Sequence, residues 1–394
     1  MINKAHKIKL YPTKNQKIFF AKSFGVARFS YNWALNKWED YYNNGENPNA
    51  QKLVKHLNSI KKTEFPWMQE TGKCCSQYAI HDLEDAYKRF RKGKSLIPKF
   101  KKKTEKDSFL AIENKEQFKQ KDFKIWIPRL GWVKCAENLR FEGKINNVVI
   151  SRNGDVFFAS VNLVSNETPI VCENQATVGV DLGIKTLLTC SDGKVFENPK
   201  ALKNNIKSLN RLQRGFSRKQ KGSNNRKKQL LKLSKKHYKI SCIRKNAIHQ
   251  ATSYLVNNYG KIVIETLKPK NMSKNRHISQ SVLDASFGEI SRQLAYKCLW
   301  NGVELVKANQ WFASSKICSC CGNKKETLKL SVREYKCENC GLEIDRDLNA
   351  AINLANYSPT AKLAESEACG ERVLTEKLKN SSVKQEIVSI KNFN

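Results

Sequence analysis

The sequence predicts a multidomain protein with one domain of mixed α/β class and other parts that are mainly helical or mainly β. Three observations predict this organisation. The length of 394 residues suffices for about two to four domains. The spacing of apolar residues is helical in 16–91, strand-like in 123–164, and alternates between the two types from 177 onward. Two Cys-x-x-Cys pairs between residues 318 and 340 indicate a small metal-binding module.

The charge balance predicts a polyanionic partner. There are 72 Lys and Arg residues against 36 Asp and Glu, for a formal net charge of +36. Nucleic acid is the first candidate, and a membrane surface is the competing one. No uncharged apolar stretch approaches the roughly 18–20 residues of a spanning helix, and the N-terminus lacks the apolar core of a signal peptide. We therefore expect a cytoplasmic, nucleoid-associated protein without a membrane partner. The odd number of cysteines, 13, argues against a disulfide framework.

The N-terminal third is predicted to be one strand followed by helices. Residues 4–12 alternate basic and apolar side chains, which places Lys7 and Lys9 on one face of a strand. Pro12 ends this strand, and Thr13 is a candidate helix N-cap. From Gln16 to about Arg91 the apolar residues recur at helical spacing, and four aromatic residues are expected in the helix core: Phe20, Phe24, Tyr31 and Trp38.

A basic segment, residues 88–103, follows these helices. A charge run is usually a solvated linker or face. Here Phe90, Pro98 and Phe100 interleave with the charges, which also fits a groove that follows a nucleic-acid backbone. The sequence favours neither interpretation.

The middle of the chain reads as a β-domain and a linker. Residues 123–164 contain strand-like runs separated by Gly and Asn, with a turn at 152–155. The strand at 4–12 could complete this domain, with the helical region inserted between. Residues 165–175 are predicted to be a linker, and the tail beyond about Tyr357 to be disordered.

The α/β domain begins at residues 177–181, an apolar strand that ends in Asp181. Two further strands form a meander with it, and residues 200–245 form a helical hairpin with 17 Lys and Arg and no acid. The next strand ends in Glu265, and a helix over 282–298, a strand over 303–308 and a helix that opens at Asp345 and Asp347 follow. This order is that of a ribonuclease H-like domain, with the hairpin and the cysteine module as insertions.

That fold would bring three carboxylates together, from Asp181, from Glu265 and from Asp345 or Asp347. Singly, each acid could be an exposed strand end or a helix N-cap. Three carboxylates packed closely repel one another and stay ionised only with cations present. Two Mg²⁺ ions held by such acids activate a water molecule and stabilise the leaving oxygen of a phosphodiester. The residues alone do not decide between Asp345 and Asp347.

The cysteine pairs have the spacing of a four-thiolate zinc site. Fifteen residues separate the pair Cys318 and Cys321 from the pair Cys337 and Cys340, and a glycine follows each pair. Four thiolates leave no open coordination position, so one structural Zn²⁺ is expected. Cys320 could replace a neighbour, but Cys321 gives both pairs the same spacing.

Taken together, these motifs resemble the TnpB (OrfB) family of transposon-encoded, RNA-guided DNA endonucleases, which are related to compact type V CRISPR effectors. The resemblance covers nearly the whole chain. The segments that carry it are Tyr11-Pro12-Thr13-x-x-Gln16, Ile127-Pro128-Arg129-Leu130-Gly131, Gly179-Val180-Asp181-Leu182-Gly183, Ile264-Glu265, Ser314-Ser315-Lys316-x-Cys318-x-x-Cys321-Gly322 and Asp345-Arg346-Asp347-x-Asn349-Ala350-Ala351.

The resemblance implies a domain plan. A wedge β-domain, barrel-like and split, would comprise residues 1–12 and 114–172, with a helical recognition domain at 13–113. A ribonuclease H-like (RuvC) nuclease domain would comprise 173–315 and 342–360, with the basic hairpin at 200–245. A zinc ribbon that binds target nucleic acid would occupy 316–341, and a disordered tail 361–394.

The resemblance also implies site residues and partners. Asp181, Glu265 and Asp347 would bind Mg²⁺ and form the catalytic triad, with Asp347 chosen by the family's Asp-x-Asn pattern. The partners would be a guide RNA from the transposon end and double-stranded DNA with a short adjacent motif, with one or two protein copies per RNA. Candidate nucleic-acid contacts are Lys7, Lys9, Tyr11, Lys99, Lys101, Lys102, Lys103, Arg211, Arg214 and Arg218.

Four other functions compete with this interpretation. A non-cleaving RNA-guided repressor would be expected to have lost acids that this chain retains. A type V CRISPR effector has the same scaffold. A strand-transfer transposase of the paired-histidine type is disfavoured because the six histidines include no His-x-His pair. A zinc-ribbon RNA-binding protein would leave the three acids unexplained.

Overall fold

The computed structural model describes residues 2–103, 107–113, 117–165, 173–328 and 332–358. The chain forms two compact units. Unit 1 comprises Met1–Thr168 and Asn205–Ser241, and unit 2 comprises Pro169–Asn204 and Cys242–Asn394. The predicted tail at 361–394 and residues 166–172 of the predicted linker lie outside the described residues.

Unit 1 is built on a seven-stranded antiparallel sheet with strand order β2-β6-β7-β1-β5-β4-β3. Its strands are β1 (Ile2–Tyr11), β2 (Ser108–Ile112), β3 (Gln120–Lys121), β4 (Lys124–Ile127), β5 (Gly131–Cys135), β6 (Lys144–Asn153) and β7 (Val156–Ser165). Because β1 pairs with both β7 and β5, the N-terminal strand completes the β-region, as predicted. Strand β2 was not predicted, because its short run Phe-Leu-Ala-Ile has no polar alternation.

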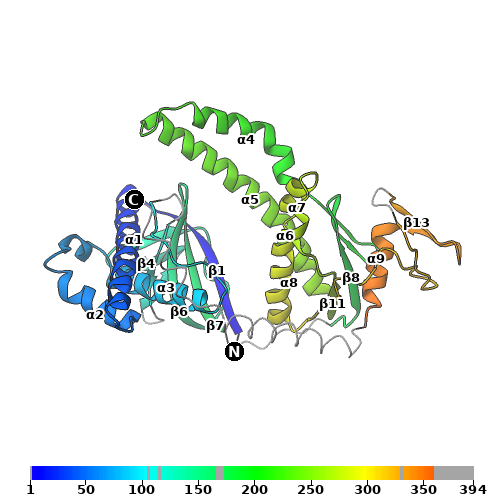
Figure 1. The fold of residues 1–394 in the computed structure, drawn as a ribbon, viewed down its shortest axis with the longest axis horizontal. Helices are drawn as coiled ribbons and strands as arrows, with labels where there is room; N and C mark the ends of the chain where they lie inside the picture. Colours follow the sequence, from blue (N-terminus) through cyan, green and yellow to red (C-terminus); the bar gives the residue numbers. More distant parts are fainter. Residues whose placement is uncertain (1, 104–106, 114–116, 166–172, 329–331, 359–394) are drawn as a thin grey trace. The chain divides into compact units, whose positions relative to one another are not determined.

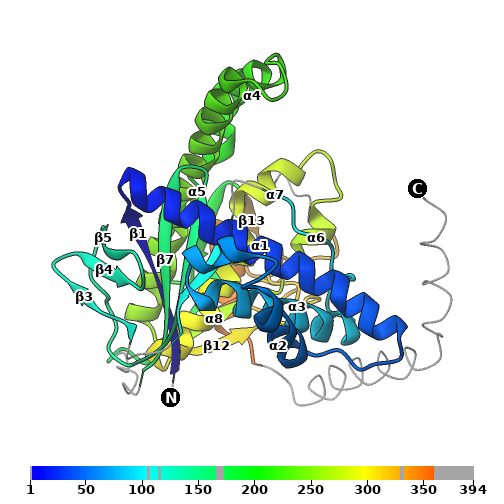
Figure 2. The same ribbon diagram turned by 90° about the vertical axis from the view of Figure 1, so that its left-hand side faces the viewer.

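Three helices of unit 1 are α1 (Lys14–Asn43), α2 (Ala50–Ile60) and α3 (Lys73–Arg91), and a 3₁₀ turn lies at Pro66–Glu70. Of these helices, α1 and α3 contact β2 of the sheet, and α2 packs against α1 and α3 (Figure 1 and Figure 2). Thr13 caps α1 in a capping box with Gln16, so the predicted cap is confirmed. The four aromatic residues predicted for the helix core are all buried, and Phe20 and Phe24 contact Phe109 of β2.

Unit 2 contains a five-stranded mixed sheet with order β10-β9-β8-β11-β12. Its strands are β8 (Thr177–Leu182), β9 (Thr186–Cys190), β10 (Val195–Glu197), β11 (Lys261–Ile264) and β12 (Glu304–Lys307). β8, β9 and β10 form the predicted meander, whereas β8, β11 and β12 run parallel. The carboxyl ends of the three parallel strands therefore share one edge of the sheet.

The helices of this half of the chain follow the predicted order with one difference. They are α4 (Ala201–Ser217), α5 (Asn224–Asn258), α6 (Pro269–Met272), α7 (Ser279–Ala285), α8 (Phe287–Asn301) and α9 (Arg346–Ala355). α4 and α5 run side by side as the predicted basic hairpin (Figure 1). The single helix predicted over 282–298 is wrong, since Ser286 has a left-handed φ of 56° and divides it into α7 and α8.

A small two-stranded sheet, β13 (Glu334–Lys336) and β14 (Glu343–Asp345), precedes α9. Within the described parts of the chain, no helix combines the length and the apolar character that a membrane span requires.

Candidate active site and metal centre

Two of the predicted acids lie at the shared carboxyl edge of β8 and β11. In the parallel pairing of these strands, Ile264 is opposite Val180. The next residues, Glu265 and Asp181, therefore emerge side by side. The backbone N–H of Leu182 donates a hydrogen bond of 3.2 Å to Oε1 of Glu265, which ties the two strand ends together.

The third acid comes from the first turn of α9. Asp345 is the N-cap of this helix, and its Oδ1 accepts hydrogen bonds from the backbone N–H groups of Asp347 and Leu348 at 2.9 and 3.0 Å. Asp347 lies in the first turn, and its Oδ1 is 3.8 Å from the guanidinium Nη1 of Arg333. The two aspartates therefore differ in role, because the Asp345 carboxylate satisfies the helix terminus.

Gly179 allows α9 to pack directly on β8. A Cβ atom at this position would lie 2.0 Å from the carbonyl oxygen of Ala351 and 2.3 Å from the backbone nitrogen of Ala355. Only glycine permits so close an approach of helix and strand backbones. Because α9 is seated in this way, its first turn is held near the end of β8.

Electrostatic coupling among the three acids reflects their proximity. Burial raises the pKa of Asp181 well above its usual value, and the charges of Glu265 and Asp347 raise it further. Burial, with a smaller contribution from Asp347, raises the pKa of Glu265 to about 7, against the opposing hydrogen bond from Leu182. Half-buried carboxylates that lie close together repel one another when they are ionised. A divalent cation bound between them offsets this repulsion, and such cations prefer oxygen ligands.

The contributions of two residues to this site were not predicted from the sequence. Gly179 is part of the quoted motif, but its close contact with α9 depends on tertiary packing. Arg333 lies in the spacer between the two cysteine pairs, and no local signal connects it with Asp347. Arg333 precedes β13, and its carbonyl oxygen accepts from the N–H of Arg346, which brings it to the start of α9.

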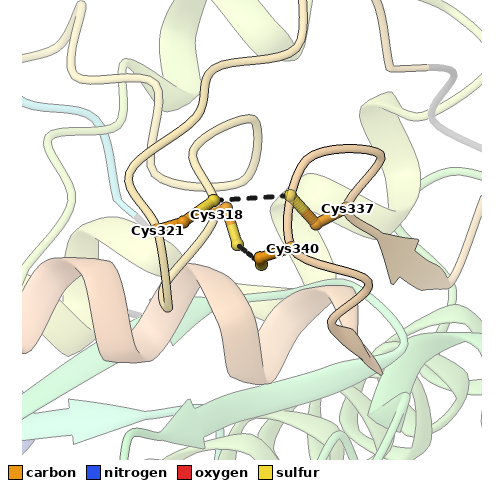
Figure 3. A group of neighbouring side chains, drawn as sticks. All are labelled: Cys318, Cys321, Cys337 and Cys340. Carbon is orange, nitrogen blue, oxygen red and sulfur yellow. Dashed lines mark hydrogen bonds between the residues drawn. The ribbon is translucent and has the colours of Figure 1, made fainter.

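The four predicted cysteines form one cluster (Figure 3). All four Sγ atoms of Cys318, Cys321, Cys337 and Cys340 lie within 4.8 Å of one another. The Sγ atoms of Cys318 and Cys340, and those of Cys321 and Cys337, are 3.6 Å apart. A tetrahedral zinc with bonds of about 2.3 Å requires sulfur atoms roughly 3.8 Å apart. The cluster therefore fits a metal ion such as zinc.

Two matching turns build this cluster. Gly322 and Gly341 have left-handed φ values of 74° and 73°, and their N–H groups donate to the carbonyl oxygens of Cys318 and Cys337 at 3.0 Å. Asn339 donates a hydrogen bond to Cys321 and lowers the pKa of that thiol to about 6, which favours the thiolate that binds metal. Cys320 is exposed and is not part of the cluster.

The ten candidate nucleic-acid contacts fall in three segments of the chain. Lys7 and Lys9 lie on the face of β1 opposite the buried Ile8 and Leu10, as predicted, and Tyr11 is exposed at its end. Arg211 and Arg214 are exposed on α4, and Arg218 follows that helix. The remaining four are Lys99, Lys101, Lys102 and Lys103, which follow α3.

The segment that contains Lys101 is attached to α1. The side chain of Asn32 accepts from the N–H of Lys101 at 2.8 Å and donates to its carbonyl oxygen at 3.0 Å. The ammonium group of Lys101 lies 3.8 Å from the centre of the Tyr31 ring. At Lys101, therefore, the segment is anchored rather than a free linker.

Three family profiles match parts of the chain. Residues 161–276 match the family described as “Probable transposase” (OrfB_IS605), residues 287–354 match a “Cas12f1-like, TNB domain”, and residues 1–47 match a “Helix-turn-helix domain”. The last description does not fit the structure of residues 2–47, where β1 is followed by the single helix α1.

Two relatives match nearly the whole chain. A protein of Escherichia coli (strain K12) with the name “Putative RNA-guided DNA endonuclease InsQ” is 32% identical over 94% of this chain and 94% of its own length. A protein of Streptomyces pristinaespiralis with the same description is 32% identical over 98% of this chain and 96% of its own length.

The fold is similar to that of a solved structure. The protein in “Cryo-EM structure of the Cas12f1-sgRNA-target DNA complex” aligns with a TM-score of 0.55 and 15% identity, over 86% of this chain and 83% of that chain.

Proposed function

This chain belongs to the TnpB (OrfB) family, and we propose that it is an RNA-guided, Mg²⁺-dependent DNA endonuclease that hydrolyses phosphodiester bonds of target DNA. The observation that carries the proposal is the placement of Asp181 and Glu265 at the adjacent ends of β8 and β11, with Asp347 in the first turn of α9, which packs on β8. The names of the two relatives described above support the same activity.

Within this proposal, unit 2 contains a ribonuclease H-like nuclease domain of the RuvC type, and Asp181, Glu265 and Asp347 are the catalytic residues that hold magnesium. Two bound Mg²⁺ ions would supply an activated water and stabilise the charge on the leaving oxygen. The chain's own part is to hold three carboxylates on rigid supports, namely two paired strand ends and the first turn of a helix seated on Gly179.

The proposed partners are a guide RNA and a double-stranded DNA target with a short adjacent motif. Base pairing with the guide would supply sequence specificity, and the basic surface would hold the heteroduplex through its backbone. A DNA substrate would place the protein at the nucleoid in the cytoplasm. The split wedge domain, the helical recognition domain and the zinc ribbon remain proposed assignments with the boundaries given above.

The test of the triad is the variant Asp181→Ala in the guide-loaded complex. We expect binding of RNA and target DNA to be retained and cleavage of a target plasmid to be lost, because one of three metal-binding carboxylates is gone. The matched control is Glu304→Gln. Glu304 lies at the amino end of β12, at the opposite edge of the sheet, where it pairs with Lys261 at 3.3 Å, so this variant should cleave normally. Full cleavage by the Asp181 variant would overturn the assignment.

The same cleavage experiment distinguishes the proposed nuclease from its main alternative, a non-cleaving repressor. A repressor built on this scaffold would protect the target from other nucleases but would leave the plasmid intact with guide and Mg²⁺ present. Sequencing of the RNA that copurifies with the protein distinguishes a transposon-end guide from a CRISPR guide. Integration of labelled transposon ends by the purified protein would instead indicate a strand-transfer transposase.

We also propose that the four-cysteine cluster binds one structural Zn²⁺. The two sulfur separations of 3.6 Å support this ion. Metal analysis of the purified protein should give one zinc per chain, and Cys337→Ser should lower that content. A protein that is free of zinc yet folded between residues 316 and 345 would contradict the proposal.

A further inference from the structure

Trp311 is a large aromatic side chain that the fold leaves in solvent. It is 83% exposed. Exposure of so much apolar surface forgoes burial energy that tryptophan ordinarily contributes to a core. The adjacent Phe312 behaves in the ordinary way, since it packs beside Val306 and Tyr357 against a core of Val263, Ala308 and Leu354.

The loop that carries Trp311 is held in place by several contacts. The backbone N–H of Trp311 donates to Oδ1 of Asn309 at 2.9 Å, and the N–H of Asn309 is hydrogen-bonded to the Tyr357 hydroxyl at 3.2 Å. The rings of Phe312 and Tyr357 meet edge to face at 4.9 Å. The indole is therefore presented on a supported loop, which reduces the entropy lost when a flat partner binds.

This loop begins at the edge of the sheet that carries the proposed nuclease site. The N–H of Ala308 donates to the carbonyl oxygen of Ile264, the residue before Glu265, at 2.8 Å. The Thr266 hydroxyl donates to the carbonyl oxygen of Ala308 at 2.6 Å. Trp311 is three residues further along, so its Cα lies within about 11 Å of that of Ala308.

The two chain segments that follow β11 and β12 at this edge are basic. Residues 266–283 contain four cations and no acid, and residues 305–325 contain four cations and no acid. Five of these cations are exposed on the segments nearest to Glu265 and Trp311: Lys268, Lys270, Lys274, Arg276 and Lys307. An aromatic face among cations is the combination with which proteins hold single-stranded nucleic acid, since bases stack on the ring while phosphates pair with the cations.

We propose that Trp311 is a base-stacking residue that holds a nucleotide of the single-stranded DNA beside the cleaved bond. The inference rests on the proposed nuclease function and adds a substrate contact to that site. Stacking does not depend on base identity, so Trp311 fixes the position of the strand and leaves sequence choice to the guide. In a duplex each base is stacked between its neighbours, which hides its faces, so the contact also selects an unpaired strand.

The first test is single-turnover cleavage by the guide-loaded complex with saturating target. Trp311→Ala should lower the rate about 10- to 100-fold, whereas Trp311→Phe and Trp311→Tyr, which keep a flat ring, should retain most of it. Trp311→Leu keeps apolar bulk without a π-face and should behave like the alanine variant. The matched control is Leu299→Ala, which removes a 66% exposed apolar side chain from α8 and should cleave normally.

A scan of abasic sites along the target strands locates the contact. Wild-type cleavage should slow when the base at one or two positions near the cut is absent, and Trp311→Ala should be insensitive to that loss. Equal rates and equal abasic profiles for the wild type and the alanine variant would overturn the inference. Loss of cleavage in the phenylalanine and tyrosine variants as well would assign Trp311 a structural role instead.

A binding measurement separates this inference from the proposed function. A single-stranded oligonucleotide that carries 2-aminopurine, mixed with the complex in Ca²⁺, should lose fluorescence with the wild type and keep it with Trp311→Ala. A wild-type complex that cleaves no target would refute the nuclease proposal while this quenching still tests stacking. Equal quenching by both proteins would refute the stacking contact.

Discussion

Asp345 and Asp347 are two residues apart, and their surroundings predict different consequences of substitution. The Asp345 carboxylate accepts two backbone hydrogen bonds at the start of α9, so it stabilises the helix. The Asp347 carboxylate makes none of these capping bonds and raises the pKa of both Asp181 and Glu265, whereas Asp345 makes only a smaller contribution, to the pKa of Asp181. A cap needs only a side-chain oxygen, whereas a magnesium ligand of this kind needs the negative charge.

We therefore expect Asp345→Asn to cleave DNA nearly as well as the wild type and Asp347→Asn to lose cleavage. Because Asn caps helices about as well as Asp, Asp345→Asn should be nearly as stable as the wild type. Ala cannot cap a helix, so Asp345→Ala should lower the free energy of unfolding by about 1 kcal/mol. Cleavage assays and thermal unfolding of the three variants measure these effects. The reverse pattern, with cleavage lost only on Asp345→Asn, would transfer the ligand role to Asp345.

Lys297 is a buried cation of α8 that the apolar pattern of this helix does not predict. Its ammonium group donates hydrogen bonds to the carbonyl oxygen of His249 and to the hydroxyls of Thr252 and Ser253, at 3.1, 2.7 and 2.8 Å. Desolvation lowers the pKa of Lys297 from 10.5 to about 8. Because all these partners belong to α5, Lys297 links α8 to α5. Desolvation of its ammonium group opposes this stabilisation.

This pKa sets a pH dependence of stability. Below pH 8 the group is protonated in both the folded and the unfolded chain, and the full desolvation cost is present. Between pH 8 and 10.5 the unfolded chain binds more protons, so the free energy of unfolding should rise, by up to about 3 kcal/mol. Denaturant unfolding across this range should show a larger rise in the free energy of unfolding for the wild type than for Lys297→Met, because only the wild type contains this group. The exposed Lys307→Met is the control, and an equal rise in the Lys297 variant would contradict the assignment.

At the scale of elements, the pattern of apolar residues predicted most strands and the long helices, because burial on one face imposes a period on the sequence. It missed β2, where the apolar run does not alternate. The order of β8 to β12 followed from this pattern, and so did the placement of Asp181 and Glu265 at strand ends. Ser286 was not predicted as a helix break because serine carries no local signal for a left-handed φ. To decide which aspartate caps α9 and which is the proposed metal ligand, one must know the residue at which α9 begins. The period of apolar residues does not locate a helix end to within two residues.

The packing of α9 on β8 makes a further prediction. Gly179→Ala should lower the free energy of unfolding by about 3 kcal/mol, because the new Cβ would lie 2.0 Å from the carbonyl oxygen of Ala351 and must displace the helix. The displacement would also move Asp347, so cleavage should fall even at temperatures where the variant is folded. Chemical denaturation and a cleavage assay measure the two effects.

The control for this substitution is Gly288→Ala on α8. A Cβ at Gly288 would meet nothing within 4 Å, so this variant should be as stable as the wild type, or more stable by about 0.5 kcal/mol. If Gly179→Ala left both stability and cleavage unchanged, the close approach of α9 to β8 would not be required for the site.

At the scale of the whole molecule, the net charge of +36 is uneven along the chain, and the hairpin of α4 and α5 concentrates it. Residues 200–245 contain 17 Lys and Arg and no acid, so opposite charges within this segment cannot offset the repulsion. A phosphate backbone offsets such repulsion and releases its counterions on binding, which makes affinity depend on salt. A segment with this density of positive charge and no acidic residue is therefore better explained by a nucleic-acid partner than by solubility alone.

The hairpin should account for a measurable part of that salt dependence. Each phosphate contact contributes about 0.7–0.9 to the slope of log affinity against log salt. Replacement of Arg211, Arg214 and Arg218 by Gln should therefore reduce the slope for guide-RNA binding by about 2, if all three arginines contact phosphates. The matched control replaces three exposed lysines on and beside α2 with Gln, namely Lys52, Lys55 and Lys62. An unchanged slope in the arginine variant would remove these residues from the RNA interface, whereas an equal loss in both variants would mean that RNA responds only to net charge.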